Sequence, residues 1–347
     1  MAQVSIKEVA RIAGVSIATV SRCINNPLQV KELTRTRVQE AIVKTGYSPN
    51  TIAQSFRRGK TNIIMVVLPS VGDPFFTDVM QGIRSVVAEH GYSIIINETN
   101  FNTMTAEEMG AMMVSRQADG FILLASIFPF GNELLKKTEN RAQPIVIGCE
   151  TISANLADFP SVHIDNVKAA TEATDFLISR GHQKIAFITG QKTSLLTKDR
   201  ESGYRSAMHK AGLNIADGWV VEGQLTINGA ARACRQLLKH PDRPTAIFCA
   251  NDEMAMGCMS EIKNQGLKIP DDISVMGFDD IRYAAVTEPA LTTISQPATE
   301  IGERVAIRLF KAIETGHQPN NKPVILPHKL IIRKSVRTIP RAQPTIQ

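Results

Sequence analysis

Length, composition and charge already exclude several classes of protein. At 347 residues, with 43% hydrophobic and 21% charged residues, the chain is predicted to be a soluble globular protein of two or three domains. No apolar run approaches the roughly 18 residues of a membrane-spanning helix, and Met1 to Val9 shows no apolar signal segment. The five cysteines are scattered and odd in number, so we expect reduced thiols, no metal site and a cytoplasmic protein.

The excess positive charge lies in the first sixth of the chain. Residues 1–60 hold ten Lys and Arg against three acids, a net charge of +7, whereas the whole chain has +6. The remaining 287 residues therefore carry −1. A solvated basic face is one interpretation of this region. A surface that binds DNA phosphates is the other, and the helical pattern of the same residues favours it.

The N-terminal residues from Ser5 to Asn25 predict two short helices joined by a tight turn. Ser5 stands at the capping position of the first helix, with Glu8 at the capping-box spacing, and Ser16 stands at the capping position of the second. Gly14 can adopt the positive φ that the turn needs. We expect an inward apolar face of Ile17, Val20 and Ile24, and an outer face of Ala18, Ser21, Arg22 and Asn25. A short helix that exposes small polar groups and one arginine fits the major groove of DNA.

Alternating apolar runs and helical segments predict an α/β architecture for the rest of the chain. A third helix is expected from near Thr34 to Gly46, and Pro49 prevents its continuation. Residues 51–58 are expected to form a short segment that orders only against a partner. A first series of buried parallel strands begins after Thr61, and a second series begins near residue 184. Two successive α/β units with a ligand cleft between them are the predicted result.

Several motifs, taken together, are specific for one family. The most specific is Val9-Ala-x-x-Ala-Gly-Val-Ser-x-x-Thr-Val-Ser-Arg22, and further matches are Gly46-Tyr-x-Pro-Asn50, Asp73-Pro-Phe-Phe76, Asn251-Asp-x-Met-Ala255 and Leu291-Thr-Thr-Ile-x-Gln-Pro297. From Ser5 to about Pro340 the chain resembles the LacI/GalR family of bacterial transcriptional repressors. Within that family, Phe128-Pro-Phe130 and residues 159–166 are most similar to the cytidine-repressor branch.

The resemblance implies a fold and a domain organisation. An all-α helix-turn-helix headpiece (1–47) and a hinge helix (48–60) precede an α/β two-lobed core like that of periplasmic binding proteins (61–340), with a tail at 341–347. We place the first lobe at about 61–162 and 291–320, and the second at about 163–290 and 321–340. The resemblance also implies a homodimer that binds a pseudo-palindromic operator in double-stranded DNA and responds to a small-molecule effector. No cofactor and no membrane partner are expected.

The resemblance also assigns DNA contacts. Arg22 matches the base-reading arginine, since a guanidinium can pair with guanine O6 and N7, and a phosphate contact alone is the alternative. Ile17 and Ala18 occupy two further specificity positions, where they either touch thymine methyl groups or simply pack. The other expected DNA-binding residues, mainly backbone contacts, are Ser5, Ser16, Thr19, Ser21, Asn25, Thr34, Tyr47, Asn50 and Ala53.

Phe56 departs from the family pattern, which has Leu at this hinge position. Two copies of the residue, one from each subunit, are expected to wedge into the minor groove at a central base step. Such a wedge unstacks the step and bends the duplex. The alternative is that Phe56 packs against the core and that the hinge behaves differently.

The resemblance also implies nine residues of the effector cleft: Phe75, Phe76, Cys149, Ser194, Leu196, Arg200, Leu225, Asn251 and Asp279. An aromatic face suits a base or a sugar ring. The Arg200 donors and Asp279 acceptors suit vicinal hydroxyls, and a structural ion pair is the alternative. Purine-binding relatives have Arg and Thr at the positions of Ser194 and Leu196, which argues against a free purine base. A nucleoside is favoured as the effector, and a sugar is second.

Catalytic motifs are missing from the sequence, which lacks G-x-S-x-G, H-E-x-x-H, C-x-x-C, a P-loop and G-x-G-x-x-G. We therefore predict a ligand-responsive transcriptional regulator with no catalytic residues, rather than an enzyme. Two alternatives are a small-molecule binding protein for uptake and an enzyme with a fused DNA-binding unit. The missing signal segment and the basic headpiece disfavour the first, and turnover of nucleosides would reveal the second.

Overall fold

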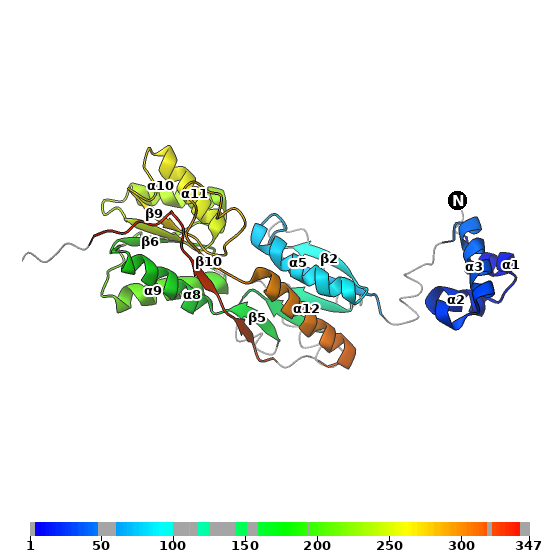
Figure 1. Cartoon of the computed structure of the whole chain (residues 1–347). Coiled ribbons are helices and arrows are strands. Elements are labelled where there is room, and N and C mark those ends of the chain that lie inside the picture. The colour runs from blue at the N-terminus through cyan, green and yellow to red at the C-terminus, as the bar shows by residue number, and fades with distance from the viewer. Residues whose placement is uncertain are drawn as a thin grey trace, which may run out of the picture. The chain divides into compact units, whose positions relative to one another are not determined.

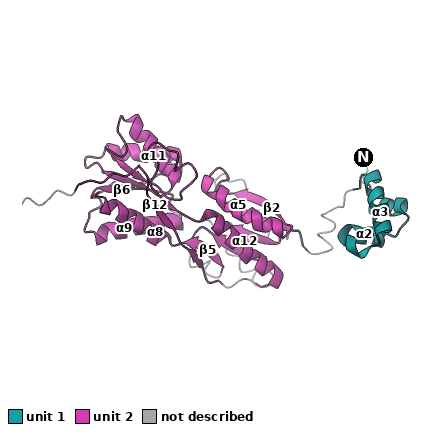
Figure 2. Ribbon diagram, in the orientation of Figure 1, with its two compact units in different colours: residues 1–61 teal, residues 62–347 magenta. Residues whose placement is uncertain are grey.

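The computed structural model describes residues 4–47, 60–99, 111, 117–124, 143–150, 159–192, 194–317 and 321–340. The chain divides into two compact units, Met1–Thr61 and Asn62–Gln347 (Figure 2). The expected DNA contacts Asn50, Ala53 and Phe56 lie outside the described residues, and so does Phe128-Pro-Phe130.

Three helices form the first unit. They are α1 (Ile6–Ala13), α2 (Ile17–Asn25) and α3 (Glu32–Thr45), with a 3-10 turn at Pro27–Gln29 before the third. Their apolar positions meet in a small core that includes Val9, Ala13, Val20 and Val38. Gly14, with a φ of 63°, turns the chain between α1 and α2. The helix pair predicted from the sequence is confirmed.

Two local predictions in the headpiece are wrong. Ser5 is the N-cap residue of α1 but its side chain makes no capping hydrogen bond, and the Glu8 carboxylate, which a capping box needs, pairs with Arg11 instead. Ile17 is 44% exposed rather than turned inward, because it is the first residue of α2 and the buried face begins one turn later. The third helix agrees with its prediction, since it begins at Glu32, two residues before Thr34, and its C-cap residue is Gly46.

Two parallel sheets organise the second unit, one in each lobe. The first lobe has a six-stranded sheet in the order β11-β5-β4-β3-β1-β2, and the second lobe has a four-stranded sheet in the order β7-β6-β8-β9. The first sheet consists of β1 (Ile63–Leu68), β2 (Ser93–Glu98), β3 (Gly120–Leu123), β4 (Ile145–Gly148), β5 (Ser161–Ile164) and β11 (Val324–Leu326). The second consists of β6 (Ile185–Thr189), β7 (Val220–Glu222), β8 (Ala246–Cys249) and β9 (Ser274–Met276).

Helices pack in pairs beside these sheets (Figure 1). In the first lobe, α5 (Pro74–Glu89) packs along α12 (Ala298–Thr315). In the second lobe the pairs are α8 (Asn166–Ser179) with α9 (Leu195–Lys210), and α10 (Ile227–Leu238) with α11 (Asp252–Asn264). The predicted α/β fold class is therefore confirmed. Among the helices that the structure describes, none has the length and apolar character needed to cross a bilayer.

The chain crosses between the lobes at positions that differ from the expected boundaries. β11 pairs with β5 in the first sheet, whereas the sequence-based boundaries place residues 321–340 in the second lobe. β10 (Thr293–Ser295) pairs with β12 (Lys329–Ile331), and the backbone N–H of Asp279 donates to Ile294 O at 2.7 Å, which ties this strand to the second lobe. β11 is only three apolar residues long, and its pairing partner β5 is distant in sequence. The sequence near β11 therefore does not show which sheet it joins.

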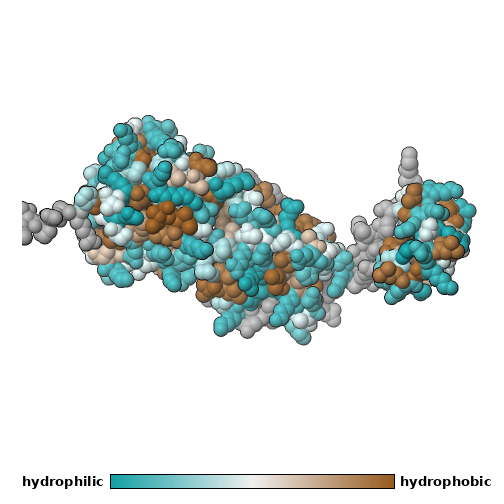
Figure 3. All heavy atoms as spheres, in the orientation of Figure 1, coloured by the Kyte–Doolittle hydropathy of each residue, from teal (hydrophilic) through white to brown (hydrophobic). Residues whose placement is uncertain are grey.

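Exposed hydrophobic residues are spread over both units. Figure 3 shows several hydrophobic patches among hydrophilic residues on the viewed face. Large exposed side chains include Leu28 and Leu33 in the headpiece, and Tyr283 and Val286 in the second lobe. Scattered apolar side chains are normal on folded proteins, so exposure by itself assigns them no function.

Candidate DNA-binding surface and ligand pocket

The second headpiece helix, α2, presents most of the residues that were predicted to contact DNA. Ser16, Ile17, Ala18 and Arg22 are exposed. The Ser16 hydroxyl accepts a hydrogen bond from the backbone N–H of Thr19 at 3.1 Å, so its predicted capping role is confirmed. The Arg22 side chain makes no hydrogen bond or ion pair with another residue in the described part of the chain, which leaves its guanidinium available to an outside partner.

The other predicted DNA contacts are less exposed. Thr19, Ser21, Asn25, Thr34 and Tyr47 are half-buried, and Ser5 is exposed. The Asn25 side-chain amide donates to Ser21 O at 2.8 Å, which orients it along the helix. Tyr47 packs against the headpiece core. Whether these residues touch DNA stays a prediction.

Arg37 is a headpiece residue whose structural role the sequence did not reveal. Its Nη2 donates to the carbonyl oxygen of Ala13 at 2.6 Å, across the turn between α1 and α2. The contact ties α3 to the turn that sets the position of α2. Because Arg37 and Ala13 are far apart in sequence, the sequence showed Arg37 only as a basic residue of a predicted helix and did not show its contact with Ala13.

A cavity of about 450 Å³ lies in the second unit and is lined by residues of both lobes. All nine residues assigned to the effector cleft line it: Phe75, Phe76, Cys149, Ser194, Leu196, Arg200, Leu225, Asn251 and Asp279. Most follow the carboxyl ends of parallel strands, where ligands of α/β proteins commonly bind. The structure thus brings these residues together, and their contact with an effector remains a prediction.

Four helices begin at this cavity. Their N-cap residues Asp73, Ser194, Thr226 and Asn251 all line it. Each side chain accepts a hydrogen bond from a backbone N–H of its own helix, at 2.9 Å for Asp73 and 3.3 Å for Ser194. The caps satisfy part of the helix ends and fix the direction in which each helix leaves the pocket wall.

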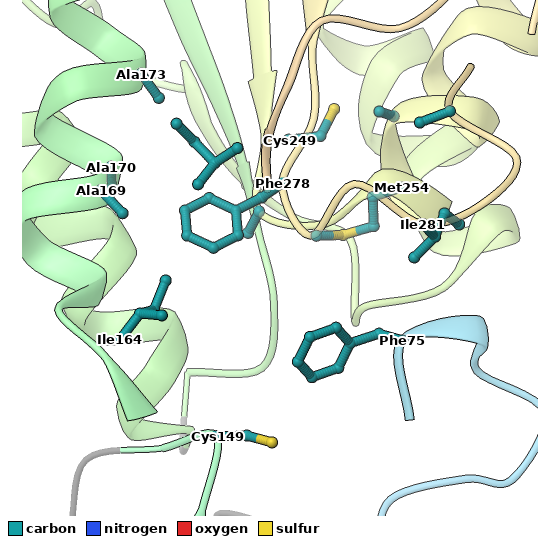
Figure 4. Close-up of a cluster of buried hydrophobic side chains, with 14 of the residues drawn as sticks. Phe75, Cys149, Ile164, Ala169, Ala170, Ala173, Cys249, Met254, Phe278 and Ile281 are labelled. Atoms are coloured by element: carbon teal, nitrogen blue, oxygen red, sulfur yellow. The ribbon is translucent and has the colours of Figure 1, made fainter. Parts of the chain in front are cut away.

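Two aromatic residues of the first lobe, Phe75 and Phe76, line the cavity. Phe75 and Phe76 are buried at the start of α5, with ring centroids 5.3 Å apart in an edge-to-face arrangement. Figure 4 shows the Phe75 ring projecting into the space between Cys149 and the second-lobe residues Phe278 and Met254. Burial raises the pKa of the Cys149 thiol, which keeps it neutral. Phe75, Phe76 and Cys149 therefore give the cavity an apolar surface.

Arg200 is the centre of the polar side. Its side chain is 2% exposed, and it donates to Asn166 Oδ1 at 3.0 Å and to Ala250 O at 2.5 Å. Nη2 lies 3.4 Å from Asp279 Oδ1, and the guanidinium carbon lies 3.6 Å from the centroid of the Phe278 ring. The pair thus combines features of a ligand clamp and of a buried structural ion pair.

Asp279 is held from two directions. Besides Arg200, the side-chain amide of Gln296 donates to Asp279 Oδ1 at 2.7 Å. Burial raises the pKa of Asp279 to about 7, and the nearby Arg200 opposes that shift. The carboxylate is thus partly compensated and lies at the edge of the cavity.

Unusual backbone conformations concentrate at the cavity. Six described residues other than glycine have a positive φ, and four of them line it: Cys149 (71°), Gln224 (58°), Leu225 (56°) and Asp279 (110°). Such conformations cost about 1–3 kcal/mol each and tend to cluster at ligand-binding sites. Their clustering supports the choice of this cavity as the candidate site independently of the side chains.

Sequence reasoning missed several residues of the cavity wall. Asp73, Glu253, Gln191 and Gln224 line it, and so does Glu150, which the sequence showed only as the neighbour of Cys149. Burial raises the pKa of Glu253 to about 7 and also raises that of Asp73. A usable signal existed only for Asp73, which opens the Asp73-Pro-Phe-Phe76 motif.

Comparison with known proteins gives matches to both units. Residues 5–50 match the family described as bacterial regulatory proteins, lacI family. Residues 61–334 match periplasmic binding proteins and the sugar binding domain of the LacI family. The HTH-type transcriptional repressor CytR of Escherichia coli K12 is 35% identical over 336 residues, 97% of this chain and 97% of that protein.

Solved structures give the same result. The lac repressor dimer bound to operator and the anti-inducer ONPF has a TM-score of 0.82 and 25% identity, over 97% of this chain and 100% of that chain. A LacI family transcriptional regulator from Enterococcus faecium with bound ribose has a TM-score of 0.69 and 26% identity, over 80% of this chain and 100% of that chain. With a DNA-binding domain and a ligand-binding domain of this kind in one chain, the protein belongs to the LacI family of bacterial regulatory proteins.

Proposed function

We propose that the protein is a transcriptional repressor that binds a pseudo-palindromic operator as a homodimer, and that a nucleoside in the cavity changes its operator affinity. The observation that carries the proposal is the convergence of all nine expected effector residues on one cavity of about 450 Å³. That volume falls within the range of small-molecule sites. The dimeric, operator-bound lac repressor supports the first part, since its structure matches this chain over 97% of its length.

The DNA-binding part of the proposal rests on α2. Arg22 would read a guanine, with Ile17 and Ala18 beside it as apolar contacts for thymine methyl groups. Ile17 is exposed, which favours contact with DNA over packing in the headpiece. The remaining expected contacts on the headpiece would hold the helix in register on the DNA backbone. Phe56 would supply the minor-groove wedge.

The charge of the cavity favours a ligand without phosphate. Among the described lining residues there are four carboxylates, Asp73, Glu150, Glu253 and Asp279, and one guanidinium, that of Arg200. A phosphate would add negative charge beside these carboxylates in a site partly shielded from water, where repulsion is strong. The helix N-termini carry only partial positive charge and are capped by their own side chains. A neutral ligand with many hydroxyl donors is the better match.

A nucleoside satisfies these conditions better than the other candidates. Its ribose hydroxyls would donate to Asp279 and accept from Arg200, and its base would add a planar surface for Phe75 or Phe76. The E. faecium regulator binds ribose, which supports the ribose part. The similarity to CytR and the motifs of the cytidine-repressor branch support the nucleoside as a whole. A free sugar is the second candidate.

Effector binding would act on the equilibrium between two arrangements of the lobes. A ligand shifts such an equilibrium only when its affinity for the two arrangements differs. Because the cavity is lined by both lobes, a ligand that contacts both can provide that difference. The spacing of the paired headpieces on the operator would follow from the arrangement that is favoured.

A ligand screen followed by operator binding tests the proposal. Melting temperatures of the full chain would be measured with nucleosides, their 5′-monophosphates, free bases, ribose and hexoses. We expect stabilisation by at least one nucleoside and none by its monophosphate. Operator affinity measured with and without that nucleoside then gives the sign of regulation. Stabilisation by a hexose alone would favour the sugar, and hydrolysis of the nucleoside during incubation would favour an enzyme.

A further inference from the structure

Two glycine–glutamine dipeptides meet at the carboxyl edge of the second sheet. In the parallel pair of β6 and β7, Thr189 lies opposite Glu222. Gly190-Gln191 follows the first strand directly, and Gly223-Gln224 follows the second. Both glutamines line the cavity. The register therefore delivers two identical side-chain amides to the same part of the wall.

Close packing explains why glycine precedes each glutamine. A Cβ atom at Gly190 would lie 2.8 Å from the side chain of Leu225, and one at Gly223 would lie 2.6 Å from the side chain of Ile188. Both distances are shorter than real Cβ contacts, so each position excludes a side chain. The two loops thus approach each other closely, which keeps Gln191 and Gln224 in one region.

The order of the strands divides the second-lobe wall into two halves. The sheet order β7-β6-β8-β9 places the loops that follow β7 and β6 at one end, and those that follow β8 and β9 at the other. The β8–β9 half carries Glu253 and Asp279. Six lining residues of the β7–β6 half are uncharged: Gln191, Ser194, Leu196, Gln224, Leu225 and Thr226. Arg200 also starts from this half, on α9, but its guanidinium reaches Ala250 O and Asp279 in the β8–β9 half. The wall is therefore charged at one end and neutral at the other.

The amides of the neutral half are free to bind a ligand. Gln191 and Gln224 are exposed, and neither side-chain amide hydrogen-bonds another residue that the structure describes. Gln224 and Leu225 are also two consecutive residues with positive φ, at 58° and 56°. Holding two adjacent residues in this conformation is unfavourable, so the fold maintains a specific presentation of this turn.

We propose that Gln191 and Gln224 bind the hydrogen-bonding edge of the nucleobase, with Leu196 and Leu225 against its ring, while the ribose lies at Arg200 and Asp279. An amide offers a donor and an acceptor side by side, which matches the adjacent donor and acceptor groups on the edge of a base. The neutral half suits the heterocycle, and the carboxylate half suits the hydroxyls of the sugar. The inference rests on the proposed function and names the residues that set base preference.

The test separates the base from the sugar. Binding of cytidine, uridine, adenosine and inosine, and of methyl β-D-ribofuranoside as a ribose probe without a base, would be measured by calorimetry on the full chain. The variants are Gln191→Leu, Gln224→Leu and, as a matched control, Gln236→Leu, which changes an exposed residue of α10 in the same lobe. The melting temperature of each ligand-free variant reports whether it folds.

Each pocket variant is expected to lower the affinity for the preferred nucleoside roughly 5- to 10-fold, as expected for one or two hydrogen bonds. The differences in affinity between nucleosides with different bases should also become smaller. Affinity for the riboside should stay unchanged in both variants, and Gln236→Leu should change neither ligand. Nucleoside binding that is equal in wild type and both variants would overturn this inference alone. An equal loss for nucleoside and riboside would also overturn it, by placing the amides at the sugar. A wild-type chain that binds no nucleoside would remove the proposed function as well.

Discussion

Arg22 in the headpiece and Arg200 in the pocket are both proposed to bind a partner, and the fold holds their side chains in opposite ways. The Arg22 side chain is exposed and bonds to no other residue in the described chain, whereas the Arg200 side chain is 2% exposed and contacts Asn166, Ala250 and Asp279. The Arg22 side chain therefore adds no polar contact to the folded headpiece, and its proposed partner is DNA. The pocket arginine is part of the fold, so its binding role and its structural role cannot be separated by simple removal.

Arg200→Ala is the substitution with the largest expected effect. It removes the charged partner of the buried Asp279 and the hydrogen-bond donor to the buried Asn166, and breaking a buried pair in this way costs about 3–5 kcal/mol. We expect loss of the effector response together with a lower unfolding free energy, measured by urea denaturation. Arg282→Ala, at an exposed second-lobe arginine, is the control and should change stability by less than about 0.5 kcal/mol. An Arg200→Ala protein that is as stable as the wild type but no longer responds to the effector would show that Arg200 has no structural role, and would contradict the contrast with Arg22.

The pH dependence of stability tests the buried side of this contrast through Asp279, the partner of Arg200. Burial raises the pKa of Asp279 to about 7, whereas in an unfolded chain an aspartate has a pKa of about 3.9. Between about pH 4 and 7 the folded state therefore binds more protons at this site, and the contribution of Asp279 to stability falls as pH rises through that window. Above about pH 7 its contribution is constant.

Asp279→Asn removes this titration, so the unfolding free energy of the wild type should decline relative to that of the variant between about pH 4 and 7. His182, whose pKa burial lowers to about 4, acts in the opposite direction in both proteins and cancels in the difference. Parallel stability curves for the two proteins would show that Asp279 titrates normally.

Arg22→Ala is expected to have a smaller effect, confined to DNA. A lost bidentate contact with guanine corresponds to about 1–3 kcal/mol of discrimination between bases. Operator affinity should fall accordingly while affinity for unrelated DNA falls less, and the melting temperature should stay the same. Lys210→Ala, at an exposed residue of α9, serves as the control for loss of one positive charge. An equal loss on both kinds of DNA would make Arg22 a phosphate contact.

The smallest expected effect compares the two serines at helix starts. Ser16 caps α2 through its side chain, and Ser5 does not cap α1 in this way. Ser16→Ala should therefore destabilise α2 by about 1 kcal/mol, and Ser5→Ala should have an effect below about 0.5 kcal/mol. Hydrogen exchange of the Thr19 and Val20 amides reports the first, and exchange of the α1 amides reports the second. Equal effects would restore the capping box that the sequence predicts.

The headpiece and the alternation of strands and helices were predictable because their signals act over a few residues. Apolar spacing, capping residues and the turn glycine Gly14 are all local. The exposure of Ile17 was not predictable, because it depends on its place as the first residue of α2, one turn before the buried face begins. The strand β11 was assigned to the wrong lobe because its pairing with β5 joins distant segments.

The pocket was predictable in part. The nine residues came from the family resemblance, and the structure brings them to one cavity. The rest of the wall depends on which strand ends are neighbours, and the order β7-β6-β8-β9 cannot be read from the sequence. For this reason Glu253, Gln191 and Gln224 were overlooked, although each lies within a few residues of a predicted strand.

A single hydrogen bond, from Gln296 to Asp279, connects the pocket to the chain segment that joins the two lobes. Gln296 follows β10 and directly precedes the segment Pro297–Ala298 that opens α12 in the first lobe. Asp279 lines the cavity and also receives Arg200. A ligand that contacts the Asp279 carboxylate is therefore connected to the segment that enters α12 of the first lobe through one side chain, that of Gln296.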